Sequence, residues 1–258
     1  MNTSFWALGW RTLWRDLRSG ELRLLMVAVT LAVAALTAVG FFSDRLQAGL
    51  QRDARQLLGG DVVVVSDNPP PPAFAARASA LGLESVATAT FPTMGRASDV
   101  RGGASRLVAL KSVDDGYPLR GKLLLQQGPG QPEEPAAGIP QRGQAWVDAS
   151  LLEALDLSVG DQLLLGDASF TIARIIAIEP DKGAGFMSFA PRVMIASADL
   201  PATRLVQPAS RVTYRLAVAG DEAAAKRYLE WAQQQAKAGE LHGVRVESLE
   251  SGRPEMRQ

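Results

Sequence analysis

The hydrophobic pattern of the chain is dominated by one uninterrupted apolar run near the N-terminus. Residues 24–43, LLMVAVTLAVAALTAVGFFS, contain no charge, Pro, Asn or Gln, and their only polar side chains are hydroxyls. A helix of about 20 residues covers about 30 Å, which is the thickness of the hydrocarbon core of a bilayer. A helix in a soluble core normally keeps one polar face, and this run has none. The pattern therefore predicts a transmembrane helix over residues 21–43.

A short amphipathic segment, residues 1–20, precedes this run. A face of tryptophan and leucine opposite a face of arginine is typical of a helix that lies in the lipid headgroup region. Tryptophan suits that depth because its ring is apolar while its N–H group stays hydrated. We therefore predict a cytoplasmic interfacial helix, the alternative being a soluble amphipathic helix. The predicted membrane-interface residues are Trp6, Trp10, Trp14, Arg11, Arg15 and Arg18.

The charges that flank the apolar run predict its orientation. Four arginines lie between residues 11 and 23, whereas the first charges after the run are Asp44 and Arg45. Since basic residues favour the cytoplasmic side, we expect a cytoplasmic N-terminus and residues 44–258 outside the inner membrane of a bacterium. The alternative is a cleaved signal peptide, whose apolar core is usually about 7–15 residues long. The best small-residue pattern, Ala32-Val-Ala34, lies inside the run, so a retained anchor is favoured.

Small and hydroxyl-bearing residues recur within the apolar run. Ala28 and Ala32 are four residues apart, and Thr30 and Thr37 are seven apart. Small residues at this spacing let another helix approach closely, and hydroxyls can hydrogen-bond across the contact. We predict that these four residues pack against further transmembrane helices.

The helical pattern continues beyond the apolar run. Leu46, Leu50 and Leu57 share one side of a helix that we expect to end at Gly59-Gly60, because glycine suits a helix C-cap. The pattern predicts that residues 44–60 form a stalk, which projects from the membrane into the aqueous space.

The remainder of the chain alternates between short strands and helices. Without residues 112–205, the order is strand, helix, strand, strand, helix, strand, which is the split βαβ order of a ferredoxin-like layer. The third strand is either 106–111 or 211–218. We therefore predict a periplasmic α/β subdomain built from residues 61–111 and 206–250. Its elements are strands near 61–66, 83–91, 106–111, 211–218 and 244–246, and helices near 73–81 and 221–238.

An inserted β-rich subdomain is predicted over residues 112–205. Ser150 and Glu153 have the spacing of a capping box that opens a short helix. Gly166-Asp167 has the composition of a two-residue hairpin loop between strands. The predicted fold class is thus α+β and membrane-anchored: one N-terminal transmembrane helix, a ferredoxin-like α/β layer and an inserted β-rich part.

Composition removes several classes of chemistry. The chain has no cysteine, only one histidine (His242) and a formal net charge of zero, with 27 basic and 27 acidic residues. These numbers argue against disulfides, thiolate or multi-histidine metal sites and a nucleic-acid partner. The chain lacks a P-loop motif, and Gly183-Ala-Gly185 lacks the third glycine of a dinucleotide site. We therefore predict no catalytic, cofactor-binding or metal-binding residue, although a Ser–Lys dyad has no fixed spacing and stays open.

Four segments, taken in order, resemble a known family. They are RTLWRDLRSGELRLL (11–25), LLGGDVVVVS (57–66), WVDASLLEALDLSVGDQLLLGDASFTI (146–172) and EPDKGAGFMSFAPRVMI (179–195). Together they resemble the N-terminal part of FtsX-like, MacB-type ABC transporter permeases, and the YbbP-like type in particular. The resemblance covers most of the 258 residues and implies a MacB-like periplasmic core.

The resemblance also implies a function. It implies a non-catalytic membrane subunit working with a separate cytoplasmic ATPase, which would carry the ATP and Mg, in a mechanism termed mechanotransmission. It implies lipid, lipoprotein or other hydrophobic cargo, or an envelope partner such as a periplasmic thioesterase or lysophospholipase. Family members have further transmembrane helices, so residues 251–258 are expected to lead into a second one. We accordingly expect either a fragment or a product that cannot form a permease alone.

Two alternatives remain open at this stage. One is a single-pass anchored scaffold or binding protein that works without an ATPase. The other is an anchored hydrolase that uses an unrecognised serine.

Overall fold

The computed structural model of the chain divides into two units, Met1–Arg52 and Asp53–Gln258, which are described separately. Within helix α2, the side chains of residues 21–22, 47–48 and 50–57 are left out of the description. The residues that the structure describes are 9–10, 14–15, 21–183, 189–208, 210–237 and 243–248.

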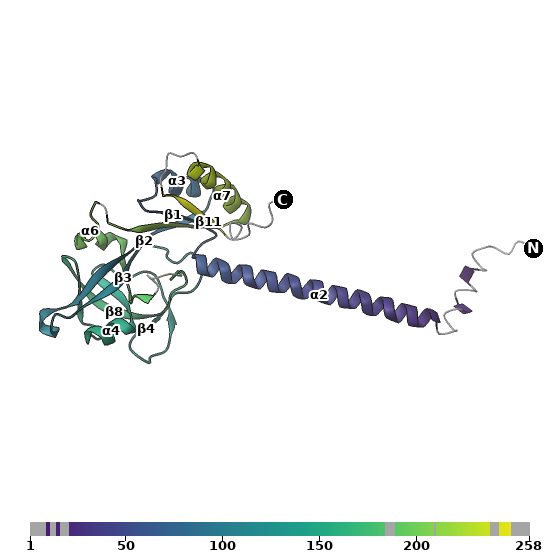
Figure 1. Cartoon of the computed structure of the whole chain (residues 1–258), viewed down its shortest axis with the longest axis horizontal. Coiled ribbons are helices and arrows are strands. Elements are labelled where there is room, and N and C mark those ends of the chain that lie inside the picture. Colours follow the sequence, from purple (N-terminus) through teal and green to yellow (C-terminus); the bar gives the residue numbers. More distant parts are fainter. Residues whose placement is uncertain are drawn as a thin grey trace, which may run out of the picture. The chain divides into compact units, whose positions relative to one another are not determined.

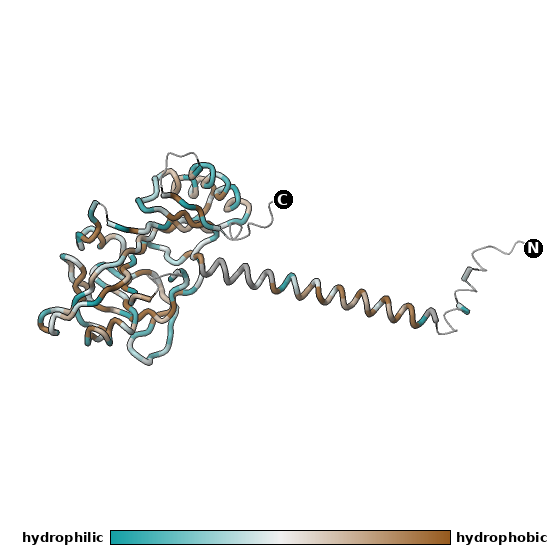
Figure 2. The backbone as a smooth tube through the Cα atoms, viewed as in Figure 1, coloured by the Kyte–Doolittle hydropathy of each residue, from teal (hydrophilic) through white to brown (hydrophobic). Residues whose placement is uncertain are grey.

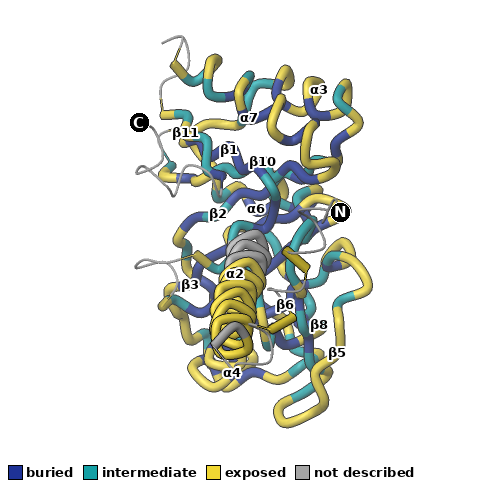
Figure 3. The backbone as a smooth tube through the Cα atoms, turned by 90° about the vertical axis from the view of Figure 1, so that its right-hand side faces the viewer, coloured by how far each residue is buried: buried dark blue, intermediate teal, exposed yellow. Residues whose placement is uncertain are grey.

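Helix α2, Glu21–Leu58, contains the apolar run and the predicted stalk in one continuous helix of 38 residues. Its segment Arg23–Leu46 is long and apolar enough to cross a membrane, and its side chains are exposed throughout. Figure 2 shows this segment as a mostly brown stretch, and Figure 3 shows it exposed. In length and composition α2 therefore agrees with the predicted transmembrane helix.

The ferredoxin-like layer is present in the second unit. Its four strands follow the order β11-β1-β10-β2, and each neighbouring pair is antiparallel. The third strand of the motif is thus β10, which settles the choice left open by the sequence. The elements are β1 (Val62–Ser66), α3 (Pro72–Ala80), β2 (Glu84–Ala97), β10 (Thr213–Ala219), α7 (Glu222–Lys237) and β11 (Arg245–Ser248).

Both helices of the layer cover the same face of its sheet (Figure 1). Buried side chains of β1 and β10 pack there against Phe74 of α3 and Tyr228 of α7. Phe74 also meets Trp231 edge-on, with 5.1 Å between ring centroids. Helix α7 begins as predicted, because Asp221 Oδ1 accepts a 3.0 Å hydrogen bond from the amide of Ala224.

The β-rich part is a closed barrel that shares strand β2 with the layer. Six strands pair in the cyclic order β2-β3-β9-β6-β8-β7, and β7 pairs back onto β2. Closure leaves none of these strands as a long free edge. The remaining barrel strands are β3 (Ser105–Val113), β6 (Gln144–Asp148), β7 (Gln162–Leu165), β8 (Ala168–Ile178) and β9 (Arg192–Ala196).

Smaller elements complete the barrel. Helix α4, Ala149–Leu155, buries its leucines in the barrel core beside Ile172 and Val193. The short strands β4 (Leu124–Gln126) and β5 (Glu134–Pro135) extend the sheet beyond β8. Two 3₁₀ turns (Asp99–Arg101 and Ser197–Asp199) and helix α6 (Leu200–Thr203) lie in the connections.

Strands β2 and β3 differ from the prediction in length and in partners. The sequence suggested that β2 ends at Phe91, but it runs through Pro92 and Gly95 to Ala97. The predicted strand 106–111 is β3, which pairs in parallel with β9 of the barrel. Because β2 is long enough to pair with β10 at one end and with β3 and β7 at the other, it belongs to both parts.

Candidate functional site at the root of helix α2

The root of α2, which we define as Leu58–Asp61, is built into the domain by close backbone packing. Gly59 has φ +76° and ends the helix, as predicted. A Cβ atom at Gly59 would lie 3.1 Å from the Cβ of Asp181, and one at Gly60 would lie 3.2 Å from the Val218 carbonyl oxygen. Both glycines are buried. The root therefore has little space for any side chain at these positions.

Polar groups hold the root on both sides of the glycines. The Asp61 carboxylate accepts hydrogen bonds from Arg120 Nε at 3.1 Å and Arg120 Nη2 at 2.8 Å, in the bidentate form that orients both groups. It also accepts one from the Gly220 amide at 3.0 Å. The last helical carbonyl, that of Leu58, accepts a 3.3 Å bond from Arg215 Nη2.

Asp181, beside Gly59, belongs to a buried ionic cluster on the outside of the barrel. Lys111 Nζ donates to Tyr117 Oη at 2.8 Å, to Glu179 Oε1 at 2.8 Å and to Asp181 Oδ1 at 2.6 Å. Tyr117 Oη also donates to Asp181. On the other side, Arg192 Nε donates to Glu179 Oε2 at 2.8 Å. The side chains of Lys111, Glu179 and Arg192 are at most 2% exposed.

Strand alternation explains how charges come to be buried here. In β3, Leu110 points into the barrel core and Lys111 to the opposite face, because successive side chains alternate. In β9, Val193 and Arg192 alternate in the same way. Glu179 follows directly after β8, and Asp181 lies two residues further along the same loop. The cluster therefore gathers the outward-facing charges of two strands around one loop.

The cluster fixes the protonation of two of its members. Burial would raise the pKa of Asp181, but Lys111 and the hydrogen bond from Tyr117 outweigh it and lower the pKa from its ordinary value of 3.8. Burial and the adjacent carboxylates of Asp181 and Glu179 raise the pKa of Tyr117 well above 10.0. Asp181 is therefore ionised and Tyr117 neutral near neutral pH.

A second set of contacts ties the cluster to helix α4. Asp148 Oδ2 accepts bonds from Lys182 Nζ and from the Arg192 amide, both at 2.9 Å. Arg192 Nη2 also donates to the Lys182 carbonyl oxygen at 3.2 Å. Arg192 Nη1 is buried without a partner among the described residues, which suits a water molecule.

The predicted capping box at Ser150 and Glu153 is wrong. Helix α4 begins two residues earlier than the box requires, at Ala149, with Asp148 instead of Ser150 in the N-cap position. No side chain caps this helix, because the carboxylate of Asp148 is engaged by Lys182 and Arg192 instead. A tertiary ionic contact has overridden the local signal.

The charged groups of the cluster are engaged by one another. Its charges balance, with Lys111, Lys182 and Arg192 against three carboxylates. Lys111 is the one buried lysine among the described residues, and two carboxylates and a phenol occupy its ammonium group, so it is not available to activate a serine. Within the described part, no group of three or more His, Cys, Asp and Glu residues could hold a metal ion.

The residues singled out from the sequence lie outside this cluster. Trp10 and Trp14 are 67% and 60% exposed, and Arg15 is exposed. Trp6, Arg11, Arg18 and His242 lie outside the described residues, as does the segment 251–258. Their assignment to a membrane interface or to a second transmembrane helix stays a prediction.

The packing and stalk residues also stay predictions. Ala28 and Ala32 are exposed on α2. The hydroxyls of Thr30 and Thr37 donate to carbonyl oxygens of their own helix, those of Met26 and Val33, each at 2.7 Å. Leu46 is 53% exposed, and the side chains of Leu50 and Leu57 lie outside the described set.

The cluster residues Lys111, Tyr117, Glu179, Asp181 and Arg192 were not predicted as a site. A signal for them exists, because Lys111 lies within the mostly apolar segment VALKSV and Arg192 begins the apolar segment RVMIA. A charge at a buried strand position requires a partner, but the sequence does not say which one.

Comparison with known proteins identifies the family. A family model described as the MacB-like periplasmic core domain matches residues 24–230. An uncharacterized ABC transporter permease of Escherichia coli K12, YbbP, is 36% identical over 221 residues. That alignment covers 86% of this chain and 26% of YbbP, so the chain spans about a quarter of the length of this relative.

Two solved structures are also similar. The periplasmic region of MacB from Actinobacillus actinomycetemcomitans aligns with a TM-score of 0.46 at 10% identity, covering 77% of this chain and 94% of that one. The extracellular domain of the noncanonic ABC-type transporter YknZ from Gram-positive bacteria aligns with a TM-score of 0.45 at 12% identity, covering 72% and 100%. On the family match and the 36% identical relative, the chain belongs to the MacB-like periplasmic core domain family.

Proposed function

We propose that this chain is the N-terminal part of the membrane subunit of an ABC transporter that works by mechanotransmission. In this proposal, the N-terminal segment lies on the cytoplasmic side, α2 crosses the bacterial inner membrane and residues 44–258 are periplasmic. The arginines before the apolar run support this orientation. The similarity to an ABC transporter permease supports the class of protein.

In the proposed division of labour, this chain performs no chemistry. A separate cytoplasmic ATPase binds ATP and Mg and hydrolyses the ATP. The periplasmic domain handles a lipid, a lipoprotein or another hydrophobic cargo, or acts on an envelope partner such as a thioesterase or lysophospholipase.

The observation that carries the proposal is the construction of the root of α2. The end of the helix is restrained by close packing and by an ion pair. Gly59 and Gly60 are buried, Gly59 packs against Asp181, and Arg120 pairs with Asp61 in bidentate form. Through Asp181 the root is connected to Lys111 of β3 and, through Glu179, to Arg192 of β9. A displacement of the helix end would therefore be passed to the barrel strands rather than absorbed by a linker.

A short insertion tests this coupling. We would insert Ser-Gly-Ser between Gly59 and Gly60 in the full-length permease, purified with its ATPase in lipid nanodiscs. The matched control carries the same insertion beside Gly130, in an exposed loop. The readout is the change in amide hydrogen exchange of residues 84–113 when ATP is added.

We expect the root insertion to remove the ATP-dependent change and to leave basal ATP hydrolysis in place, whereas the loop insertion should alter neither. An unchanged ATP response in the root insertion would count against the proposal that the root of α2 transmits motion to the barrel. If no ATPase co-purifies with the full-length protein, the anchored binding protein becomes the better reading.

A further inference from the structure

The outside of the barrel carries a recess at a gap in the pairing of β2. Strand β10 pairs with β2 as far as Thr90, and β7 begins to pair with it at Gly95. Residues 91–94 therefore have no neighbouring strand on that side. The gap leaves backbone and side chains of β2 accessible between two paired stretches.

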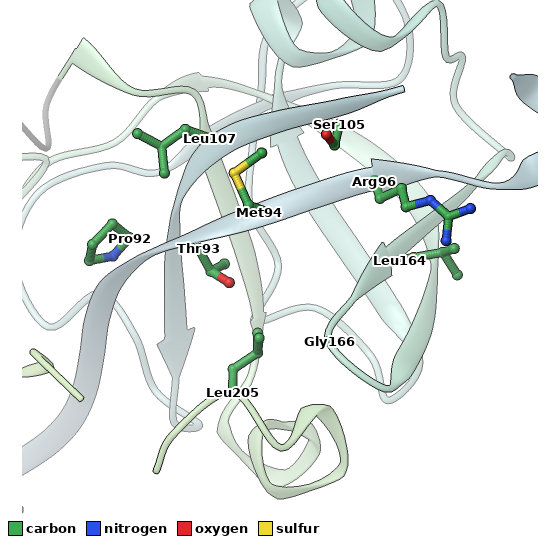
Figure 4. Close-up of a pocket in the computed structure, with 9 residues that line it drawn as sticks. All are labelled: Pro92, Thr93, Met94, Arg96, Ser105, Leu107, Leu164, Gly166 and Leu205. Atoms are coloured by element: carbon green, nitrogen blue, oxygen red, sulfur yellow. The ribbon is translucent and has the colours of Figure 1, made fainter. Parts of the chain in front are cut away.

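Apolar side chains from four segments line the recess (Figure 4). Met94 and Leu107 are directly opposite each other on β2 and β3, and they are 49% and 41% exposed. Leu164 of β7 and Leu205 complete the apolar lining. The volume is about 680 Å³, within the range of about 300–1,000 Å³ that is usual for sites of small molecules.

The wall beside Leu205 is fixed by the fold. Gly166 has φ +58°, and a Cβ atom there would lie 2.0 Å from the Thr203 carbonyl oxygen and 2.9 Å from Leu205 Cγ. The amide of Asp167 donates to that same carbonyl oxygen at 3.0 Å. These close contacts hold the backbone next to Leu205 against the β7–β8 turn.

The side chains that line the recess carry one positive charge and no negative charge. Arg96 is the one charged residue that lines it, and Thr93 and Ser105 add hydroxyl groups. Arg96 lies towards the Leu164 end, away from Pro92 (Figure 4). Arg96 also pairs with Asp99 outside the recess, but a guanidinium has five N–H donors and this pair engages only part of them.

We propose that this recess binds a single-chain anionic amphiphile, with its acyl chain over Met94, Leu107 and Leu164 and its carboxylate or phosphate group on Arg96. An apolar lining without any carboxylate, next to one guanidinium and two hydroxyls, matches this ligand in polarity and charge. The inference deepens the proposed function, because it names a class of cargo for the periplasmic domain. Binding itself needs no ATPase.

Photo-crosslinking tests the site on the full chain. The chain is placed in phosphatidylcholine nanodiscs with a laurate analogue that carries a diazirine on its chain, and the labelled peptides are mapped by mass spectrometry. We expect the label on β2, β3 and β7, with competition by unmodified laurate. Label spread evenly over the domain, or confined to α2, would overturn the proposal.

Matched variants distinguish binding at this site from nonspecific binding of the probe. Leu107→Gln and Arg96→Gln should each lower the labelling of the recess about tenfold, as expected for a loss of about 1.4 kcal/mol. Val100→Asn and Arg106→Gln, exposed residues of the same hairpin that do not line the recess, should not change it. Equal labelling in all four variants would contradict the proposal.

Two further measurements address the charged group. Asp99→Asn removes the carboxylate that shares Arg96 and should increase labelling. Dodecanol should compete much less well than laurate, and equal competition would refute the role of Arg96. A failure of these tests with an intact ATP response of the domain would reject this cargo while leaving the coupling proposal in place.

Discussion

Where β3 and β9 carry the ionic cluster, the two faces of the barrel wall are buried equally well and by opposite chemistry. Inside, Leu110, Ile172 and Val193 pack in an apolar core that is 0% exposed. Outside, Lys111, Glu179 and Arg192 are at most 2% exposed and are held by ion pairs. An apolar core requires volume to be filled, whereas a buried ionic cluster requires each charge to keep its partner. The first kind of burial gives stability, and the second fixes positions.

Removal of one charge from the cluster should have the largest effect. Lys111→Met leaves Glu179 and Asp181 with too few partners, so we expect a loss of about 3–5 kcal/mol in the free energy of unfolding. The measurement is chemical denaturation of the full chain in detergent micelles, with exposed Lys122→Met as control. Adding Glu179→Gln and Asp181→Asn to Lys111→Met should recover part of the loss, whereas additive losses would mean that the cluster is not coupled.

The cluster should make the stability of the protein fall at both acid and alkaline pH. The lowered pKa of Asp181 contributes stability that is complete above its ordinary pKa of 3.8 and is lost as pH falls through the folded value. The raised pKa of Tyr117 contributes stability below pH 10.0 that is lost as pH rises above it. Between these two pH limits, Asp181 and Tyr117 should contribute almost no pH dependence to the unfolding temperature. Asp181→Asn should remove its acid limb, and an unaltered limb would contradict the assignment.

A conservative change inside the barrel should cost less. Ile172→Val deletes one methylene group from a closely packed core, and we expect a loss of about 0.5–1.5 kcal/mol. Denaturation of this variant, alone and combined with Lys111→Met, measures whether the two faces of the wall act independently. A loss above that of Lys111→Met would reverse the comparison.

The smallest effect is expected at a surface ion pair of the same domain. Arg204 and Asp167 are 3.5 Å apart, with side chains 81% and 63% exposed. Solvent screens such a pair, so Arg204→Ala should change the free energy of unfolding by about 0–1 kcal/mol. A much larger loss in the same denaturation series would show that the exposed pair contributes to position as the buried cluster does.

The elements predicted well were those with a local signal. The run 24–43 has no polar face, the strand pattern of 211–218 alternates, and Gly166-Asp167 joins β7 to β8 as a hairpin loop. Asp221 likewise marks the start of α7. In each case the residues that determine the element lie within it or next to it, so the ferredoxin-like order could be read from the chain.

The barrel closure and the cluster could not be predicted in this way. Pairing of β7 with β2, and of β3 with β9, joins segments that are far apart in the sequence. The strand predicted near 83–91 continues through Pro92 and Gly95, because Pro92 lies where β2 has a neighbour on one side alone and Gly95 packs closely on Val108. Partners of Lys111 and Arg192 are likewise set by the fold, and no spacing in the sequence gives them.

The pairing of β1 with β10 has a consequence for the order of folding. Val62 lies opposite Val218, so β1 is synthesised long before its neighbour in the sheet. The barrel strands lie between β1 and β10 in the sequence, so they can pair with one another before β10 is available to pair with β1. We expect the barrel to form first during synthesis. The root of α2 should become fixed later, when β10 has been synthesised and pairs with β1. Until β10 has been synthesised, β1 lacks this partner, and an unpaired strand edge is open to pairing with another chain.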